Sequence, residues 1–476
     1  MEMNAKYKWI ALSITSLGTM LSIMTSNTLM IALPTIVKDL STSMGIVIWV
    51  LMSYMLAITI LVPAIGRIVD IVGRKKLYIL GFGIFTLTSL VAGLAQTGLE
   101  LLLVRIVQSI GGALILANGS AIITDAFPKN ELGKALGING MIISVGAAIA
   151  PLVGGFITLR FGWRWVFFFN VPLGLLGTLW AAIAIHETAI LPKGQHFDFW
   201  GALLFGVGMF LLLLALSLGG FNGWGSPLIL WLFISGALLL SIFVFVEMHV
   251  AEPLFDIELF KSKTLSFAFL ATLLNGIARG ALIFLLIFYL QGVRAMDPLL
   301  AGLYIMPFSI GLMIISPISG SLADRYGSQI LSTLGLSLSA IGLLGYTWIR
   351  ADTPISQVIL WQTIVGIGSG FFNSPNSNTI MGAVRPERRG IAAGTRTMML
   401  NAGSVISLAM TFAIISSGLT QEAMQGLFAG TQVGSEGIAI DQFIHDLHIA
   451  FFISFCISTV AAIISFVRGP KPKNIA

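Results

Sequence analysis

Long apolar stretches separated by short polar segments run through the whole 476-residue sequence. A helix rises about 1.5 Å per residue, so about 20 apolar residues cross the roughly 30 Å hydrocarbon core of a bilayer. Stretches of this length lie at approximately 9–33, 46–66, 77–96, 99–123, 135–158, 166–185, 199–219, 228–248, 265–290, 298–320, 328–348, 355–380, 391–416 and 447–467. The pattern predicts an all-α membrane protein with about 14 transmembrane helices and both termini on one side.

The composition supports a membrane protein, because 57% of the residues are hydrophobic and 10% are charged, whereas soluble domains carry roughly 25% charged residues. The first apolar stretch follows Lys6 and Lys8 and is too long for a secretory signal, so we expect it to remain as a helix. A single cysteine, Cys456, excludes an intramolecular disulfide or a thiolate metal cluster. The basic residues are spread over short loops, so we expect no nucleic-acid partner. We also expect no metal and no cofactor.

The distribution of basic residues predicts the orientation. If both termini are cytoplasmic, eighteen Lys and Arg residues fall on inner segments, five on outer segments and three within spans. Cytoplasmic loops carry an excess of Lys and Arg, so this arrangement is favoured. The longest outer loop, about 417–446, carries Glu422, Glu436, Asp441 and Asp446 and no Lys or Arg. We therefore expect a multi-pass protein of the cell membrane (inner or plasma membrane) with both termini in the cytoplasm.

The sequence contains an internal repeat. A shift of 254 residues superposes Pro63, Gly66, Asp70, Gly73, Gln108 and Gly112 on Pro317, Gly320, Asp324, Gly327, Gln362 and Gly366. Chance matches of Gly and Pro are the alternative, but all six pairs share one offset and equivalent places in the helix order. The repeat predicts two six-helix halves, 1–190 and 263–476, with two inserted helices and a cytoplasmic linker at 191–262. Transporters built from repeats bind their solute between the halves and alternate its access.

The segment from Gly66 to Lys76 reads GRIVDIVGRKK. It resembles the signature loop of the major facilitator superfamily, G-x-x-x-D-x-x-G-R-K. The resemblance implies the major facilitator fold and a charge latch that holds the inner face closed and releases during turnover. The residues expected in this latch are Gly66, Asp70, Gly73, Arg74, Asp125, Asp324 and Arg325. The alternative is that they only mark a loop and fix the topology.

The fourth helix carries RIVQSIGGA, with Arg105 and Gln108 about one turn apart on one face. A charge at that depth is costly unless it is paired or hydrated, so the side chain is expected to face the bundle interior. The passage resembles the family's helix-four motif, whose arginine is linked with proton coupling. The coupling candidates are Arg105, Gln108, Asp125 and Glu100. A structural arginine bonded to backbone carbonyls is the alternative.

The fifth helix reads GAAIAPLVGG, and Pro151 predicts a bend with close packing at the glycines. It resembles the exporter motif G-x-x-x-G-P-x-x-G-G, with Ala150 in place of the second glycine. The motif positions are Gly146, Pro151, Gly154 and Gly155. Further passages, including WVLMSY at 49–54, GWRWVFFFNVP at 162–172 and YLQGV at 289–293, resemble the fourteen-helix drug:proton antiporter branch of the family.

The sequence departs from that branch in the first helix. The branch usually carries L-D-x-T-I-V-N-V-A-L-P, whereas this chain reads MTSNTLMIALP, so Thr25 replaces a titrating aspartate. No acidic residue lies near the middle of a predicted span, and three arginines, Arg105, Arg279 and Arg396, lie within spans. An interior with fixed positive charge favours neutral or anionic amphiphiles over cations. The candidates for the substrate cavity are Thr25, Asn27, Tyr54, Arg279, Asn275 and Asn376. The alternative is that nearby amides and carbonyls satisfy the arginines.

These features predict a secondary active exporter of small amphiphilic compounds, resembling multidrug efflux proteins. Its expected partners are the solute, protons and the lipid bilayer. Proton coupling is implied by the resemblance, and an importer or facilitator of an organic anion or nutrient is the alternative. A membrane sensor of the same fold is the non-transport alternative. We expect no enzymatic activity, since no paired acids or activated nucleophile occur at membrane depth. We expect a monomer.

Overall fold

The computed structural model describes residues 5–128, 131–187, 198–250, 257–384, 389–419 and 436–469. Regular structure in these ranges is helical, and they contain no strand. Fourteen segments are long and apolar enough to cross a membrane, which confirms the predicted number of spans. Three of the spans, Arg164–Ala184, Lys263–Val293 and Ser328–Trp348, are built from consecutive shorter helices.

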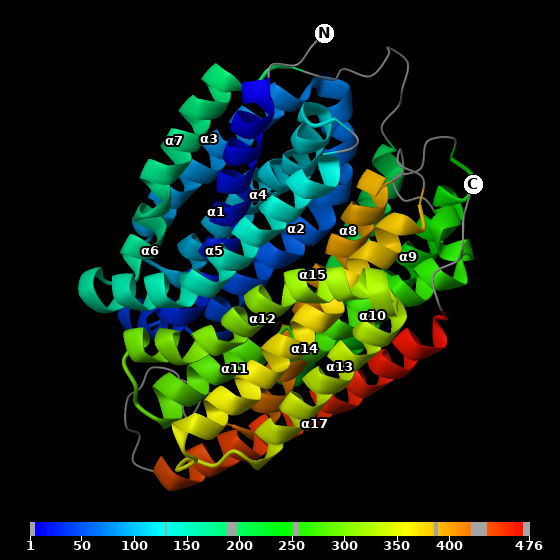
Figure 1. The fold of residues 1–476 in the computed structure, drawn as a ribbon. Helices are drawn as coiled ribbons and strands as arrows, with labels where there is room; N and C mark the ends of the chain where they lie inside the picture. The colour runs from blue at the N-terminus through cyan, green and yellow to red at the C-terminus, as the bar shows by residue number, and fades with distance from the viewer. Residues whose placement is uncertain are drawn as a thin grey trace. The chain divides into compact units, whose positions relative to one another are not determined.

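The first of two compact units comprises Met1–Phe199 and Asp297–Leu303. Its helices, drawn from blue to blue-green in Figure 1, are α1 (Ala5–Asp39), α2 (Met44–Val72), α3 (Arg74–Gly93), α4 (Gly98–Ala126), α5 (Leu132–Phe161), α6 (Arg164–Phe168) and α7 (Asn170–Ala184). Tyr78, Phe82 and Phe85 follow one face of α3 and are fully buried in the core of this unit. These rings fill the space where α3 packs against α4 and α7.

The second unit comprises Trp200–Met296 and Tyr304–Ala476. Its elements are α8 (Phe199–Asn222), α9 (Pro227–Glu247), η1 (Ile257–Lys261), α10 (Lys263–Arg279), α11 (Leu282–Phe288), η2 (Tyr289–Val293), α12 (Pro298–Tyr326), α13 (Ser328–Gly345), η3 (Tyr346–Trp348), α14 (Ile355–Gly382), α15 (Arg389–Gly418) and α17 (Glu436–Val467). Phe199 and the first residues of α12 belong to the first unit. Small apolar clusters around Phe269 and Phe372 form its core.

The helix pairing of the first unit recurs in the second. The pairs α3–α4, α1–α5, α3–α7 and α1–α4 correspond to α13–α14, α10–α15, α13–α17 and α10–α14. The turns also match, since Gly73 separates α2 from α3 with φ 114° and Gly327 separates α12 from α13 with φ 89°. Glycine adopts this region without the steric cost of a Cβ atom. The packing therefore supports the internal repeat, while the boundaries at 190 and 263 stay predictions.

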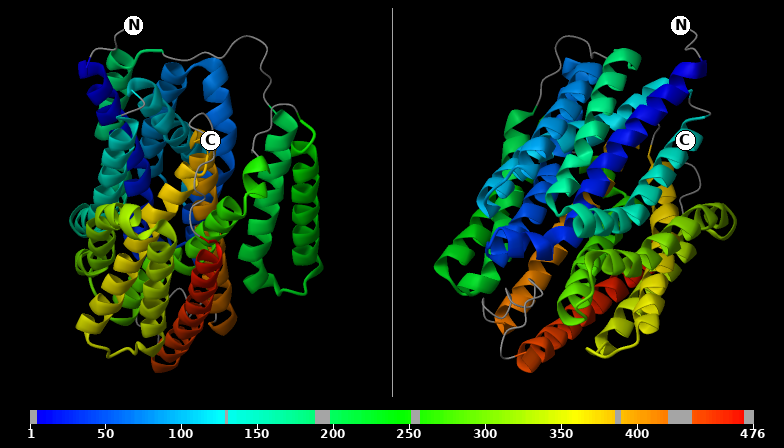
Figure 2. Two further views of the ribbon diagram at one scale, coloured as in Figure 1. Left: turned by 45° about the vertical axis from the view of Figure 1, so that its right-hand side comes forward. Right: turned by 90° about the vertical axis from the view of Figure 1, so that its left-hand side faces the viewer.

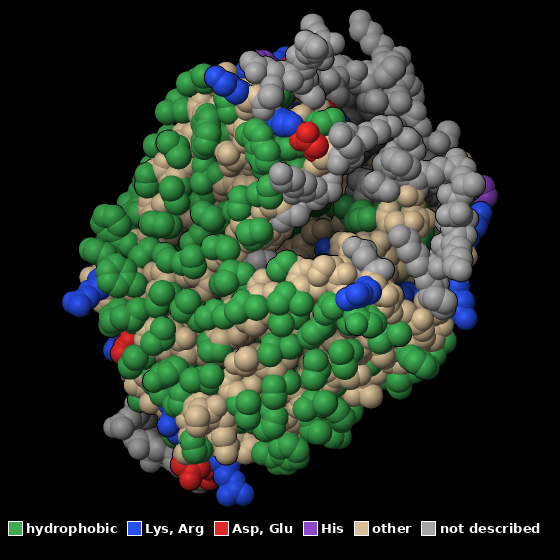
Figure 3. All heavy atoms as spheres, viewed as in Figure 1, with side chains coloured by type: hydrophobic (Ala, Val, Ile, Leu, Met, Phe, Trp, Pro, Cys, Tyr) green, Lys and Arg blue, Asp and Glu red, His purple; other side chains and the backbone are tan. Residues whose placement is uncertain are grey.

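Helices α8 and α9 form the inserted pair, and Figure 2 shows them side by side in green. Gly208 and Gly236 lie where the two helices meet, and a Cβ atom on Gly236 would be 3.0 Å from the Gly208 carbonyl oxygen. Small residues allow membrane helices to approach this closely. Trp231 and Phe245 on α9 are 71% and 66% exposed, which is suited to lipid rather than to water. Hydrophobic side chains also cover most of the face shown in Figure 3.

One expectation about the last outer loop is wrong. The hydropathy pattern predicts that this loop ends at about residue 446. In the structure, α17 begins at Glu436, and its apolar span begins at Ile440. Asp441 and Asp446 therefore lie on a helix, and their polar side chains concealed its first turns in the hydropathy pattern. Residues 420–435 of the predicted loop, with Glu422, lie outside the described residues.

Close contact of α3 and α4 gives a test of the packing. A Cβ atom on Gly111 would lie 2.7 Å from the Phe85 backbone nitrogen and 2.8 Å from the Gly81 carbonyl oxygen. Backbone cannot move aside as a flexible side chain can, so we expect Gly111→Ala to destabilise the protein by about 1–3 kcal/mol. Gly83 on the same helix pair has no atom within 4 Å of an added Cβ, so Gly83→Ala is the matched control. Thermal inactivation in detergent should separate the two variants, and equal behaviour would contradict this packing.

Candidate functional site

The turn between α2 and α3 begins a charged cluster at one end of the first unit. Gly73 ends α2, its N–H donates to the Val69 carbonyl, and Arg74 is the first residue of α3. Arg74 forms an ion pair with Asp125 on α4 and donates from Nη1 to the Ala121 carbonyl at 3.0 Å. The structure thus brings together two of the predicted latch residues. Their side chains are 14% and 24% exposed, so water reaches the pair.

Glu187, just after α7, belongs to the same cluster and was missed by the sequence analysis. Its carboxylate accepts from the Lys75 N–H at 3.1 Å and lies directly against Gly73, so that a Cβ atom there would be 2.9 Å from it. A carboxylate at this position stabilises the start of α3, whose first N–H groups have no helical acceptor. No sequence motif marks Glu187, because it lies more than a hundred residues after Gly73 in the sequence and contacts it only in the folded chain.

The remaining predicted latch residues are less informative. The side chains of Asp70 and Asp324 lie outside the described part of the structure. Arg325 is exposed at the end of α12, and Gly66 is half-buried with no atom within 4 Å of an added Cβ. Their role in the latch therefore stays a prediction.

Arg105 lies in a buried polar network inside the first unit. Its side chain is fully buried, with Nη1 donating to Gln108 Oε1 at 2.6 Å and Nε to the Val50 carbonyl at 3.3 Å. The guanidinium carbon lies 4.0 Å from the centre of the Tyr54 ring, a cation–π contact. Gln108 Nε2 then donates to Ser89 Oγ at 2.8 Å. The predicted pairing of Arg105 with Gln108 is present, and Tyr54 contacts it too.

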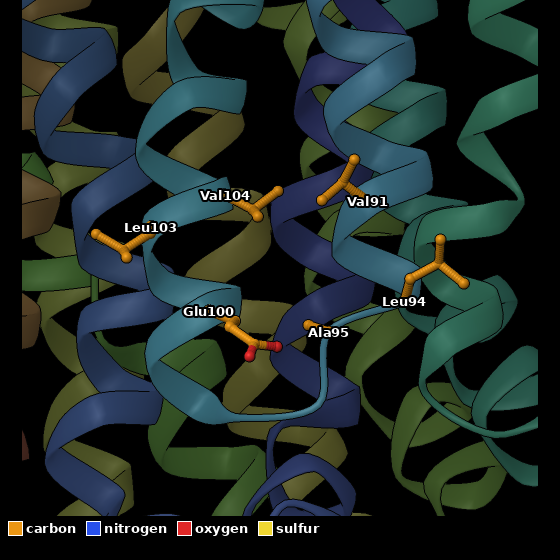
Figure 4. Close-up of a pocket in the computed structure, with 6 residues that line it drawn as sticks. All are labelled: Val91, Leu94, Ala95, Glu100, Leu103 and Val104. Carbon is orange, nitrogen blue, oxygen red and sulfur yellow. The ribbon is translucent and has the colours of Figure 1, made fainter.

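Glu100 lies at the start of α4, and its role in proton coupling stays a prediction. Its backbone N–H donates to Thr97 Oγ1 at 3.2 Å, and its carboxylate accepts from the Gln96 N–H at 2.8 Å, so it caps the start of α4. Figure 4 shows Glu100 at the edge of an open pocket of about 300 Å³ between α3 and α4. The pocket is otherwise lined by Val91, Leu94, Ala95, Leu103 and Val104. Because several of these side chains are exposed, the pocket is a surface groove suited to lipid chains.

The glycines of the fifth-helix motif sit at helix contacts. Added Cβ atoms on Gly146 and Gly154 would lie 2.7 Å from Met20 and 2.8 Å from the Thr28 Cα atom, so both glycines allow α5 to approach α1. Gly155 lies against the Pro298 carbonyl, in the short part of α12 that groups with the first unit. Pro151 is inside α5 as predicted. The motif therefore acts through backbone packing.

The second unit holds two half-buried arginines on neighbouring helices. Arg279 on α10 and Arg396 on α15 lie close enough to interact electrostatically, and Arg279 lies 5.5 Å above the Phe308 ring. The Nε atom of each arginine is buried without a hydrogen-bond acceptor, and so is Nδ2 of Asn275, one turn from Arg279. Among the described residues, no carboxylate forms an ion pair with either arginine. Unpartnered donors and positive charge therefore share one region of this unit.

The other cavity candidates have local partners or lie partly exposed. Thr25 is fully buried and its hydroxyl donates to the Leu21 carbonyl at 2.8 Å, a bond within α1. Asn27 is half-buried. Asn376 is fully buried, and its Nδ2 donates to Thr272 Oγ1 at 2.9 Å and to the Ala268 carbonyl at 3.2 Å. The hydrogen bonds of Thr25 and Asn376 are thus made to other groups of the protein.

Arg468 was missed by the sequence analysis, which assigned it to the terminal segment. It follows α17, is 3% exposed and donates from Nη1 to Asn376 Oδ1 at 2.6 Å. Burial lowers the pKa of Arg468 from its ordinary value to about 10. The guanidinium therefore stays charged at neutral pH. Arg468 therefore occupies one acceptor position of the Asn376 amide oxygen.

Asp446 was also missed, because it was placed in a loop. It lies on α17 inside the apolar span Ile440–Val467 and is 3% exposed. One oxygen, Oδ1, accepts from Gln442 Nε2 at 3.0 Å, and the other, Oδ2, is buried without a hydrogen-bond partner. Recognising it from sequence would have required treating the acidic residues as part of the helix.

The fourteen apolar spans and the helix pairing that recurs in the two units are those of a multi-pass membrane protein. The family model of the Major Facilitator Superfamily matches residues 15–234, 199–408 and 268–475. The chain therefore belongs to the major facilitator superfamily, and it is a transporter of a small-molecule substrate rather than an enzyme.

Similar proteins of known name span more than one substrate class. The riboflavin transporter RibZ of Clostridioides difficile is 31% identical over 415 residues, covering 87% of this chain and 90% of that protein. Multidrug resistance protein 3 of Bacillus subtilis is 30% identical over 447 residues, covering 93% and 86%. A bacterial homologue of the human lysosomal transporter Spinster, in an inward-facing and occupied conformation, shares the fold with a TM-score of 0.66 at 17% identity, covering 98% and 97% of the two chains.

Proposed function

We propose that this transporter is a secondary active exporter of small amphiphilic compounds, coupled to protons, that favours neutral and anionic substrates over cations. The observation that carries the substrate preference is the pair Arg279 and Arg396, which lies within the second unit without a carboxylate partner among the described residues.

The charges of Arg279 and Arg396 give the electrostatic reason for this substrate preference, because a charged side chain within a membrane span is costly. An arginine near the centre of a membrane helix costs about 3 kcal/mol even after relaxation. A second positive charge nearby raises this cost, since like charges repel strongly where water is excluded. A solute with carbonyl or carboxylate oxygens reduces the cost by accepting from the unpartnered donors of Arg279, Arg396 and Asn275. A lipophilic cation increases it.

The relatives and the motifs support the rest of the proposal. One relative is named a riboflavin transporter and another a multidrug resistance protein, which favours organic solutes with aromatic rings. The glycine and proline positions of α5 match the exporter motif and pack closely, which favours export. The excess of basic residues on one side supports cytoplasmic termini in the cell membrane. The Arg74–Asp125 pair is the proposed latch of the transport cycle.

A charge-graded panel in proteoliposomes tests this proposal. Carboxyfluorescein, riboflavin and ethidium serve as anionic, neutral and cationic probes, with and without a pH gradient, for wild type and Arg279→Ala. We expect the wild type to transport the anionic or neutral probe about tenfold faster than ethidium, and the variant to lose most of this preference, because about 1.4 kcal/mol of charge interaction is removed. A clear preference of the wild type for ethidium would sink the substrate assignment.

A matched control is available on the surface of the same unit. Arg325 is exposed at the end of α12. Arg325→Ala therefore removes one positive charge and leaves Arg279 and Arg396 unchanged. It is a predicted latch residue, so its overall rate is free to change, but the ratio of anion to cation transport should not. An equal loss of preference in both variants would assign selectivity to net charge rather than to Arg279.

Import or facilitated movement of an organic anion is the second candidate, and the same two arginines favour it. The direction of net transport separates the candidates. Export by proton antiport predicts that inverting the pH gradient across oriented vesicles inverts the direction of probe accumulation. Equal rates with either gradient would instead indicate facilitation.

A further inference from the structure

Asp446 is a buried carboxylate on an apolar span, where the hydropathy pattern had placed it in a loop. We propose that Asp446 on α17 is a proton-binding residue of the transport cycle, held at the contact between α15 and α17. This inference rests on the proposed proton coupling and names the group that carries the proton.

The position of Asp446 fits a group that exchanges a proton with water only at intervals. It lies six residues after Ile440, the start of the apolar span, which places it about 9 Å along the helix from that point. Its side chain is 3% exposed, whereas Asp441, five residues earlier, is exposed. A carboxylate removed from water is costly unless it is paired, and binding a proton removes the charge.

The hydrogen bonds of Asp446 leave one oxygen for the proton. Oδ1 accepts from Gln442 Nε2 at 3.0 Å, and Oδ2 is buried with no partner. Oδ2 lies directly against Gly418, the last residue of α15, where an added Cβ atom would overlap with it. The last carbonyl groups of a helix have no helical donor. A protonated Oδ2 is therefore a hydroxyl donor at a helix end that presents acceptors.

No strong cation holds Asp446 in the ionised form. Among the described residues, His445 on α17 is the titratable group that interacts electrostatically with it, and His445 is exposed. The last turn of α15, Ile415–Gly418, carries no titratable residue. On α10, Arg279 interacts with Arg396 instead.

The other polar and aromatic contacts of α17 described here do not involve Asp446. His448 shares a hydrogen bond with the Ile349 carbonyl at 2.6 Å, and Tyr346 of η3 stacks on Phe451. Arg350 follows η3, and its carbonyl accepts from Tyr289. These groups lie around the face of α17 that packs on α13 and η3, whereas Asp446 contacts α15.

The proposed step moves one proton between water and Oδ2. When water reaches the contact between α15 and α17, hydronium gives its proton to Oδ2, so one O–H bond of hydronium breaks and the O–H bond of the neutral acid forms. Packing of the two helices then keeps the neutral acid away from water. When water enters the contact again, that O–H bond breaks, water takes the proton and the carboxylate is restored. Gly418 is necessary in this arrangement because any larger residue displaces the carboxyl group from the helix end.

Asp446→Asn tests the proposal, because it preserves the shape of the side chain and its bond with Gln442 but cannot release a proton. Carboxyfluorescein and riboflavin are the probes, each measured in proteoliposomes as accumulation driven by a pH gradient and as exchange between equal concentrations without a gradient. We expect driven accumulation to fall about tenfold or more, while exchange changes far less. Asp441→Asn, five residues earlier on the same helix and exposed, should leave both measurements unchanged.

The outcomes distinguish this inference from the proposed function. Driven accumulation that survives in Asp446→Asn overturns the role of Asp446. Loss of exchange together with driven accumulation, in both Asp446→Asn and Gly418→Ala, shows a structural role and overturns it as well. If Gly418→Ala retains exchange but shifts the pH dependence of accumulation, the proposal is supported. A wild type that exchanges the probes but ignores the gradient removes proton coupling and this inference together, while solute transport stands.

Discussion

Gln108→Leu is expected to destabilise the first unit by about 2–3 kcal/mol and to abolish most transport, because it removes the acceptor of a fully buried arginine. Arg105 keeps only the Val50 carbonyl and the Tyr54 ring, since Nη2 already has no acceptor. Leucine has nearly the volume of glutamine, so the effect comes from the lost hydrogen bonds. The measurement is the temperature at which half of the detergent-solubilised protein is lost, together with transport of carboxyfluorescein.

The internal repeat provides the control for this prediction. Gln362 matches Gln108 at the offset of 254 residues, is equally buried on α14, and has no partner for Oε1 or Nε2. Replacing an unpartnered buried amide with a hydrocarbon relieves a desolvation cost, so Gln362→Leu should keep or raise the stability. If the two variants lose the same stability, the Arg105 network has no special weight.

Breaking the pair Arg74–Asp125 is expected to reduce transport about tenfold with little change in stability. Partly exposed ion pairs contribute about 0–1 kcal/mol to folding, whereas a contact present in one state of a transport cycle shifts the balance of states by about 1–3 kcal/mol. Asp125→Asn and Arg74→Gln test this, with steady-state transport and thermal stability measured side by side. The double variant Arg74→Asp/Asp125→Arg should recover part of the activity, although Arg74 also donates to the Ala121 carbonyl.

A second ion pair of the first unit serves as the comparison. Lys8 and Glu131 are paired and are 18% and 39% exposed, similar to the proposed latch. They join α1 to the residue before α5 and include no residue of the turn between α2 and α3. Lys8→Gln should change transport by less than about twofold. A tenfold loss there would show that any ion pair in this part of the unit limits the cycle, and the latch assignment would lose its basis.

The hydropathy pattern was sufficient for the number of spans and the class of fold. Each span needs only enough apolar residues to cross the bilayer, and backbone polar groups there must be satisfied within a helix. The repeat was also visible, because Gly73 and Gly327 are required by the same turn. The pattern failed at the start of α17, where Asp441 and Asp446 interrupt the apolar run although the helix continues. Hydropathy measures the average of a window and cannot show which face of a helix a single acid occupies.

Partners at long sequence separation were beyond the sequence. Glu187 meets Gly73 and Lys75, and Arg468 meets Asn376, through helices that lie adjacent only in the folded chain. The sequence grouped Asn376 with Arg279 as cavity candidates, but Arg468 takes the Asn376 oxygen and Thr272 takes its amide hydrogen. Hydrogen bonds of this kind depend on distances of a few tenths of an ångström, and residue types alone do not specify them.

The sequence by itself determined that the chain crosses a membrane fourteen times in two related halves, because lipid imposes length and hydrophobicity on each helix. It also determined that arginines lie within the spans. The tertiary structure decided what those charges contact. Gln108 and Tyr54 contact Arg105, whereas Arg279 and Arg396 form no ion pair with a carboxylate among the described residues. It also decided that Asp446 is buried beside Gly418. The physical reason is that burial, charge compensation and hydrogen bonding are properties of neighbours in space, which helix packing alone creates.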